Sequence, residues 1–340
     1  MIIAQDFETL VTGHGTKNCD MNALLEQSRE ISRTWQNHIV KNEEQVGFSL
    51  DRNLRFQFQT EQKVKREADI TQFAFSQLCT RIGVPGKYID KCYKSGKEDL
   101  ALQNFRAWAD EAKGNMLIRE NEGVVRAVLS DSYAPFDSYK VLRTLKYTMN
   151  MKRFQPTQVY LSEDRLVVRF VDFTPLPLKD GSPLYVGVAV SSSDVGRGSL
   201  SMKMFLYRSV CTNGLLISSG NGTLYKQSHI GESMTESKMQ VFQRAFNNMD
   251  LITEEMIETI KQNRERALKD FEMQILVEKV KRELKLSKEK SEQFESLVGG
   301  YEPTKWGIVN SVTELAQEFS LDRRLELEEW AGNLFMAKVA

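Results

Sequence analysis

Basic and aromatic side chains are interleaved between Arg126 and Arg208, and this combination could bind a nucleic acid. Single-stranded DNA or RNA is held by cations that follow the phosphates and by flat rings on which bases stack. The residues of these types are Arg126, Tyr133, Lys140, Arg143, Lys146, Arg165, Arg169, Arg197, Lys203, Tyr207 and Arg208. From this set we predict phosphate contacts by Arg165, Arg169, Arg197, Lys203 and Arg208, and base stacking on Tyr133 and Tyr207.

The segment from Leu200 to Val210 reads as the strand that would present several of these groups. Successive side chains of a strand point to opposite faces of the sheet. Lys203, Phe205 and Tyr207 therefore share one face, whereas Met202, Met204, Leu206 and Arg208 share the other. The first face is either an open binding platform or a layer of aromatic rings packed beneath a helix, and the sequence leaves both readings open.

Groups for metal or nucleophilic chemistry are present, but their spacing does not assemble a site. The acids of the middle region lie in turns, where carboxylates also stabilise loops. A two-metal nuclease would need several of them to converge. The four cysteines form no CxxC pair and the three histidines lie far apart, so neither a zinc site nor a disulfide framework is expected. We predict no catalytic residue, no metal and no cofactor, and keep a metal-dependent nucleic-acid enzyme as a further alternative.

The segment Thr71–Gly96 resembles a helix-turn-helix. Two predicted helices flank the sequence GVPG at 83–86, and the second carries Lys87, Lys91 and Lys94. A recognition helix in a DNA groove would carry such cations. Helix pairs joined by a glycine turn are nevertheless common, and Pro85 and the short second helix weaken the match. We therefore favour a packing role for this segment.

The elements that must position these groups follow from hydrophobic periodicity. We expect helices over 21–42, 71–81, 88–93 and 99–112, the last with Leu100, Leu102, Phe105 and Trp108 on its apolar side. Strands are expected within 48–59 and at 116–119, 124–129, 157–161, 165–173, 185–191 and 200–210. A helix over 138–149 would be capped by Asp137, and a later one by Ser287.

Strands neighbour strands with few crossover helices, which is typical of the α+β class. We predict a central antiparallel or mixed sheet with packed helices, followed by a mostly helical C-terminal region. The expected divisions are a mainly helical N-terminal region with a short strand pair (1–112), a β-rich basic core (113–232) and a helical C-terminal region (233–340). Apolar stripes in the last region predict that the protein self-associates.

The charge is unevenly distributed, although the formal net charge is zero. Residues 113–230 hold 15 Lys and Arg against 9 Asp and Glu, whereas residues 231–340 hold 16 against 21. A polyanion would be expected to bind the basic middle. No apolar run approaches the roughly 18 residues that cross a bilayer, and the N-terminus lacks signal-peptide features. We therefore expect no membrane association and a cytoplasmic location in a bacterial host.

Three motifs in a fixed order resemble a widespread family of phage and plasmid proteins that carry a domain of unknown function. They are SDSYAPFDSYKVL (130–142), GRGSLSMKMFLYRSVCTNGL (196–215) and TKWGIVNSVTEL (304–315). The likeness spans roughly residues 70 to 330. It implies a setting in mobile genetic elements, where single-strand annealing proteins are common, but it carries no catalytic residues over to this chain.

The leading hypothesis is therefore a phage or plasmid protein that binds single-stranded DNA in recombination or replication and is not an enzyme. The alternative is a protein that inhibits a host defence system by binding a host protein. That alternative accounts better for the neutral net charge.

Overall fold

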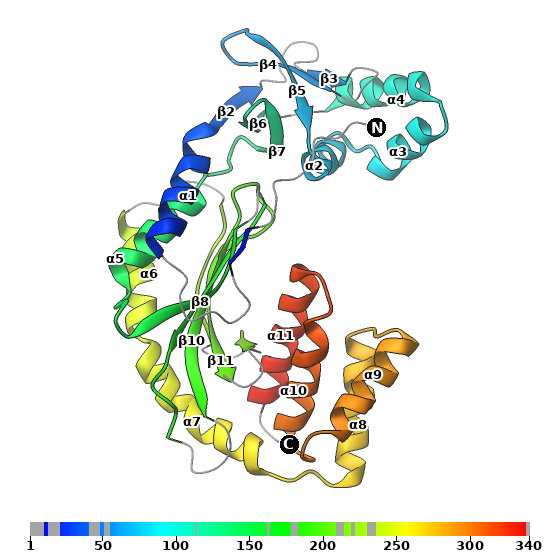
Figure 1. The fold of residues 1–340 in the computed structure, drawn as a ribbon. Coiled ribbons are helices and arrows are strands. Elements are labelled where there is room, and N and C mark those ends of the chain that lie inside the picture. Colours follow the sequence, from blue (N-terminus) through cyan, green and yellow to red (C-terminus); the bar gives the residue numbers. More distant parts are fainter. Residues whose placement is uncertain are drawn as a thin grey trace.

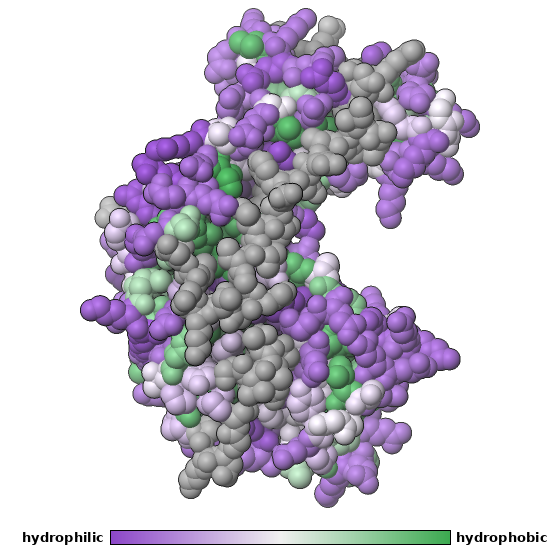
Figure 2. Space-filling view, in the orientation of Figure 1, coloured by the Kyte–Doolittle hydropathy of each residue, from purple (hydrophilic) through white to green (hydrophobic). Residues whose placement is uncertain are grey.

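The computed structural model describes residues 10–12, 21–40, 48–50, 55–112, 114–161, 164–177, 183–208, 214–218, 222–229 and 236–337. These residues form two sheets and eleven helices, which confirms the predicted α+β class. The molecule is curved, with one sheet at its N-terminal end, the second in the middle and a group of helices at the other end (Figure 1). The space-filling view shows a hollow between the two ends (Figure 2).

The N-terminal sheet has six strands in the order β2-β6-β7-β5-β4-β3. Their bounds are β2 (Trp35–Val40), β3 (Phe48–Leu50), β4 (Phe56–Gln59), β5 (Lys65–Ile70), β6 (Met116–Asn121) and β7 (Val124–Ser130). Only β5 and β7 pair in parallel among these strands. The predicted boundary at 112/113 therefore cuts through this sheet, because β6 and β7 belong to it.

Helices α2 (Gln72–Ile82), α3 (Gly86–Lys94) and α4 (Glu98–Glu111) pack with this sheet. The turn between α2 and α3 forms because Gly83 adopts a left-handed conformation with φ of 76°, which costs glycine little. Phe75, Phe105 and Ile118 fill the shared core. The helix pair predicted over Thr71–Gly96 is thus confirmed.

The predicted helix over 21–42 is wrong in its second half. Helix α1 (Met21–Thr34) ends where β2 begins, and β2 pairs with β6 from Trp35↔Asn121 to Val40↔Met116. The Asn121 side-chain amide donates to Thr34 Oγ1 at 2.7 Å and to the carbonyl oxygen of Ile31 at 3.3 Å. These bonds satisfy the helix end, so pairing with a distant strand overrides the local helical pattern.

The central sheet has seven strands, with β1-β8-β9-β10-β11-β12 in order and β13 also paired to β11. Their bounds are β1 (Leu10–Thr12), β8 (Phe154–Leu161), β9 (Leu166–Asp172), β10 (Leu184–Ser192), β11 (Leu200–Arg208), β12 (Gly214–Ile217) and β13 (Thr223–Gln227). Helices α5 (Ser138–Thr148), α6 (Glu236–Asn247) and α7 (Met249–Glu265) lie along one side, and α11 (Leu321–Met336) lies on the other (Figure 1).

The C-terminal helices α8 (Asp270–Glu283), α9 (Lys288–Gly299), α10 (Lys305–Ala316) and α11 share one hydrophobic core with the central sheet. Ser287 caps α9 as predicted, because its Oγ accepts from the Lys290 amide at 3.2 Å. Gly332 brings α11 directly onto β12, since a Cβ there would overlap the carbonyl oxygen of Leu216. Among the helices of the described ranges, none is both long and apolar enough to cross a membrane.

Candidate functional site

The predicted faces of β11 are confirmed, but the cationic face is covered. Met202, Met204 and Leu206 point into the main core. Phe205 and Tyr207 lie in a second apolar cluster, against which Leu325 of α11 packs. The second reading of this strand is therefore the observed one: the rings pack beneath a helix.

Carboxylates of α11 neutralise the cations of this face. Lys203 Nζ lies 2.8 Å from Glu329 Oε1. Arg165 pairs with Asp322, and Arg197 lies 2.6 Å from the second Asp322 oxygen and also pairs with Asp164. Three of the predicted phosphate-binding residues, Arg165, Arg197 and Lys203, thus pair with carboxylates of α11, although the Arg197 side chain remains 38% accessible.

Arg169 is the most deeply placed of these residues. Its guanidinium pairs with the fully buried Glu328, donates to Gln158 Oε1 at 2.9 Å and lies 5.6 Å from the centre of the Phe205 ring. Glu328 also accepts from Arg324 Nε at 3.0 Å. A phosphate could reach Arg169 only if α11 left the sheet.

The predicted stacking residues are also packed. Tyr207 is buried with its ring 6.3 Å from that of Phe173 and 6.4 Å from that of Phe205. Burial raises the pKa of the Tyr207 phenol. The side chain of Arg208 lies outside the described residues. Tyr207, which is 7% exposed, therefore presents little ring surface to a base.

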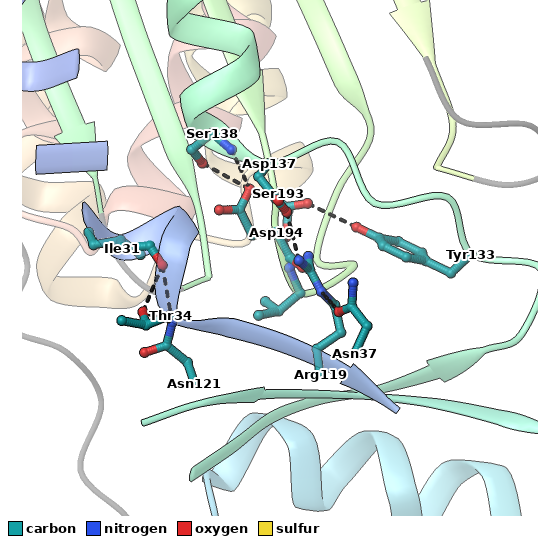
Figure 3. A network of polar contacts seen from close by, with 11 residues as sticks. Ile31, Thr34, Asn37, Arg119, Asn121, Tyr133, Asp137, Ser138, Ser193 and Asp194 are labelled. Carbon is teal, nitrogen blue, oxygen red and sulfur yellow. Dashed lines mark hydrogen bonds and ion pairs between the residues drawn. The ribbon is translucent and has the colours of Figure 1, made fainter. Parts of the chain in front are cut away.

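Tyr133 belongs to a buried polar network that joins the two sheets (Figure 3). At its centre the fully buried Arg119 of β6 donates to Asn37 Oδ1 at 3.0 Å, to Asp137 Oδ1 at 2.6 Å and to the carbonyl oxygen of Asp194. The guanidinium also lies 4.4 Å from the centre of the Trp35 ring. One side chain thereby ties β2, α5 and the loop after β10 together.

The predicted capping role of Asp137 is wrong in its detail. Asp137 occupies the N-cap position of α5, but its side chain makes no capping bond there. Asp194 caps the helix instead, because its Oδ1 accepts from the Ser138 amide at 2.8 Å and from Ser138 Oγ at 2.9 Å. Burial, with the nearby Asp137 charge, raises the pKa of Asp194 to about 7.

Tyr133 also belongs to this buried network between the two sheets. Its hydroxyl donates to the carbonyl oxygen of Ser193 at 3.0 Å, and its ring stacks on His229 at a centroid distance of 5.3 Å. Burial raises the pKa of its phenol. These contacts give Tyr133 a structural role between the sheets.

Groups for metal chemistry do not converge in the part of the chain that the structure describes. No three His, Cys, Asp or Glu side chains there are placed to hold one ion. Cys79 and Cys92 are buried free thiols, and burial raises the pKa of Cys79 to about 12. A thiol with so high a pKa is a poor nucleophile at neutral pH.

An open cationic surface lies elsewhere, on α3 and α4. Lys87, Lys91 and Lys94 recur at i, i+4 and i+7 and share an exposed side of α3. On the same pair of helices, Tyr88, Leu100 and Trp108 are 38%, 44% and 48% exposed. We call this set, together with Asn104 and Lys97, the α3–α4 surface. Figure 2 shows mostly hydrophilic residues at this end of the molecule, with paler ones among them.

The rings of the α3–α4 surface are held in place by their neighbours. Asn104 Nδ2 donates to the Tyr88 hydroxyl at 3.3 Å, which links α4 to α3. The Trp108 ring lies against Gly83, where a Cβ would be 4.0 Å from its Cε3. Both rings therefore belong to one connected surface rather than to separate loops.

The cations of this surface are largely unneutralised. Lys94 pairs with Asp90 at 2.5 Å. Within the described residues, no ion pair involves Lys87, Lys91 or Lys97. Residues 81–108 hold six Lys and Arg against three Asp and Glu.

The sequence signal for this surface was partly visible. The lysine spacing on α3 indicates it, but the prediction that Leu100 and Trp108 lie on the apolar side of α4 is wrong, because both side chains are exposed. The buried positions of α4 are Ala101, Leu102, Phe105 and Ala109. Leu100, Asn104 and Trp108 follow each other at intervals of four on the neighbouring, exposed face. The helical phase of α4 therefore separates the exposed face from the buried one.

The comparison with protein families gives one match. Residues 127–331 match the family described as "Domain of unknown function (DUF932)". No curated protein and no solved structure gives a significant match. The matched segment begins in β7, includes the covered face of the central sheet and ends within α11. Because it spans more than half of the chain, this protein belongs to the DUF932 family.

Proposed function

We propose that this protein binds single-stranded nucleic acid through the α3–α4 surface, without catalysing a reaction, in the replication or recombination of a phage or plasmid. The observation that supports this proposal is that the α3–α4 helix pair carries two exposed rings, Tyr88 and Trp108, together with Lys87 and Lys91, which are exposed and form no ion pair within the described residues. On the covered sheet face, by contrast, Phe205 and Tyr207 are buried, and the predicted phosphate-binding residues of the described chain are paired with carboxylates.

The chemistry of the surface favours single strands over duplexes. Unpaired bases expose their faces and can stack on aromatic rings, which contributes about 1–3 kcal/mol per base. The neighbouring lysines can neutralise the phosphates that follow each stacked base. A duplex hides its base faces, so Tyr88 and Trp108 would add little to duplex binding.

Fluorescence anisotropy with a labelled oligothymidylate, measured across a salt series, tests the proposal. We expect Trp108→Ala to weaken binding about tenfold through lost stacking. Lys87→Ala combined with Lys91→Ala should lower the slope of log affinity against log salt by about 1.4, since each phosphate contact on a single strand contributes about 0.7.

A matched control removes cations from another exposed site. Arg282 and Lys288 have side chains that are 77% and 94% exposed and lie at the α8–α9 end. Arg282→Ala combined with Lys288→Ala should leave both affinity and salt slope unchanged. Absence of binding at low salt, or equal loss in the control, would show the proposal to be wrong. Equal affinity for duplex would favour the helix-turn-helix reading instead.

A second candidate is inhibition of a host defence system through binding of a host protein. It is supported by Phe271 and Ile275, which lie one turn apart on α8 and are 59% and 63% exposed. Exposed apolar pairs of this kind mark protein contacts, including self-association. Sedimentation of the protein and of a Phe271→Ser, Ile275→Ser variant tests the predicted oligomer. Failure of oligonucleotide binding would make this candidate the stronger one.

A further inference from the structure

A cavity of about 320 Å³ lies between the covered face of the central sheet and the first half of α11. Binding sites for small molecules begin at about this size. Its sheet side is formed by Arg165, Lys203, Lys226, Ser191 and Ser201, with Val167 and Ala189 as apolar wall. Asp322, Leu325, Glu326 and Glu329 form the helix side.

The cavity lining holds three cations and three carboxylates, but two of these carboxylates also pair with arginines outside the lining. Lys203 has Glu329 as its partner, and Arg165 has Asp322, which is shared with Arg197. Glu326 pairs at 2.7 Å with Arg323, which is not a lining residue. Lys226 is exposed and, among the described residues, forms no ion pair.

Hydroxyl donors add to these cations. Ser191 Oγ and Ser201 Oγ lie 2.9 Å apart on neighbouring strands. Only one of the two hydroxyls can donate in that bond, so the accepting one keeps a proton for a further acceptor. The sheet side therefore presents ammonium, guanidinium and hydroxyl donors above a short apolar wall.

We propose that this cavity binds a small phosphate monoester, with the phosphate replacing the Glu329 carboxylate on Lys203 and bridging to Lys226. A phosphate carries more negative charge and more acceptor oxygens than a carboxylate, so it can engage several of these donors at once. The Lys203–Glu329 pair that it displaces is partly exposed, with 23% and 33% of the two side chains accessible. Such pairs contribute little to stability, so replacing the Glu329 carboxylate by phosphate on Lys203 costs little free energy. The organic part of the ligand would lie against Val167, Ala189 and Leu325.

This site is separate from the α3–α4 surface, and the inference does not depend on the proposed function. Isothermal titration calorimetry with inorganic phosphate and with adenosine monophosphate tests it, with sodium chloride at matched ionic strength as the blank. We expect Lys226→Ala to weaken binding of the monophosphate about tenfold. Lys226 is exposed, so this variant should fold normally.

A second variant should change the affinity for the monophosphate in the opposite direction. Glu329→Gln removes the competing charge and should tighten binding several-fold, whereas a purely structural Lys203–Glu329 pair predicts no gain. The Lys87→Ala, Lys91→Ala double variant should bind the monophosphate as the unaltered protein does, even where it no longer binds oligonucleotide. Lack of heat with both ligands, or unchanged affinity in Lys226→Ala, would overturn the inference.

Discussion

Two groups of cations in this chain have opposite surroundings. On the central sheet, Arg165, Arg169, Arg197 and Lys203 meet carboxylates of α11 that lie more than 100 residues away in the sequence. On α3, Lys87 and Lys91 are exposed and form no ion pair within the described part of the chain. The number of cations in a segment therefore says less about a polyanion site than what the rest of the chain places over them.

The largest effect expected from this contrast is on stability at the covered face. Glu328→Ala leaves the buried guanidinium groups of Arg169 and Arg324 without their shared carboxylate. Removing one partner of a buried ion pair costs about 3–5 kcal/mol. Urea denaturation should show this loss, whereas Glu326→Ala on the exposed side of the same helix should change little. Equal effects would mean that burial of Glu328 does not matter.

Close packing of α11 gives the next largest effect. Alanine normally stabilises a helix by about 1 kcal/mol relative to glycine. Gly332→Ala should instead destabilise the protein by about 1–3 kcal/mol, because the new methyl group would overlap the carbonyl oxygen of Leu216. Thermal unfolding measures the sign. Gly299→Ala, which meets nothing within 4 Å, is the matched control.

The buried network around Arg119 and Asp194, between the two sheets, should make the free energy of unfolding depend on pH. The raised pKa of Asp194 means that the folded protein holds its proton more tightly than the unfolded chain. This contribution is complete below the unfolded value of 3.8 and is lost as pH rises to about 7. His229 opposes it, since burial lowers the pKa of that ring.

A variant separates the contribution of Asp194 to the pH dependence from that of His229. Asp194→Asn keeps the shape of the side chain without its charge, beside the same Asp137 and Arg119 neighbours. Relative to this variant, the unaltered protein should lose stability between about pH 4 and pH 7 and then remain level. Chemical denaturation at several pH values measures the difference, and a constant difference would contradict the assigned shift.

The smallest effect belongs to the open surface. Lys87→Ala combined with Lys91→Ala should change the free energy of unfolding by no more than about 0.5 kcal/mol, because neither side chain is buried or paired. The same variant is expected to lose oligonucleotide affinity. A large loss of stability would show that α3 depends on its lysines for folding, and the contrast between the two regions would then fail.

Local pattern was enough to predict most helices, the two faces of β11 and the cap of α9. It failed where distant partners decide the outcome. Trp35–Val40 continues a helical pattern but becomes β2, because β6 offers an unpaired edge. Asp137 stands at the correct position for a cap, yet Arg119 takes its carboxylate.

The covering of the sheet could not be read from β11 itself. Lys203, Phe205 and Tyr207 fit an open platform and a packed layer equally well. The deciding partners are Leu325, Glu328 and Glu329, on the last helix of the chain. These acids belong to the acidic C-terminal region of the sequence (231–340), but in the fold they lie against the basic central sheet.

The place of Arg119 has a mechanical consequence. To bend the curved molecule between its two sheets, a dehydrated guanidinium would have to leave Asn37, Asp137 and the Asp194 carbonyl together. The curved molecule should therefore be rigid, with a constant distance between its N-terminal sheet and its C-terminal helices. A partner that binds both ends of the molecule at once would have to match this distance, since the protein would not bend to fit it.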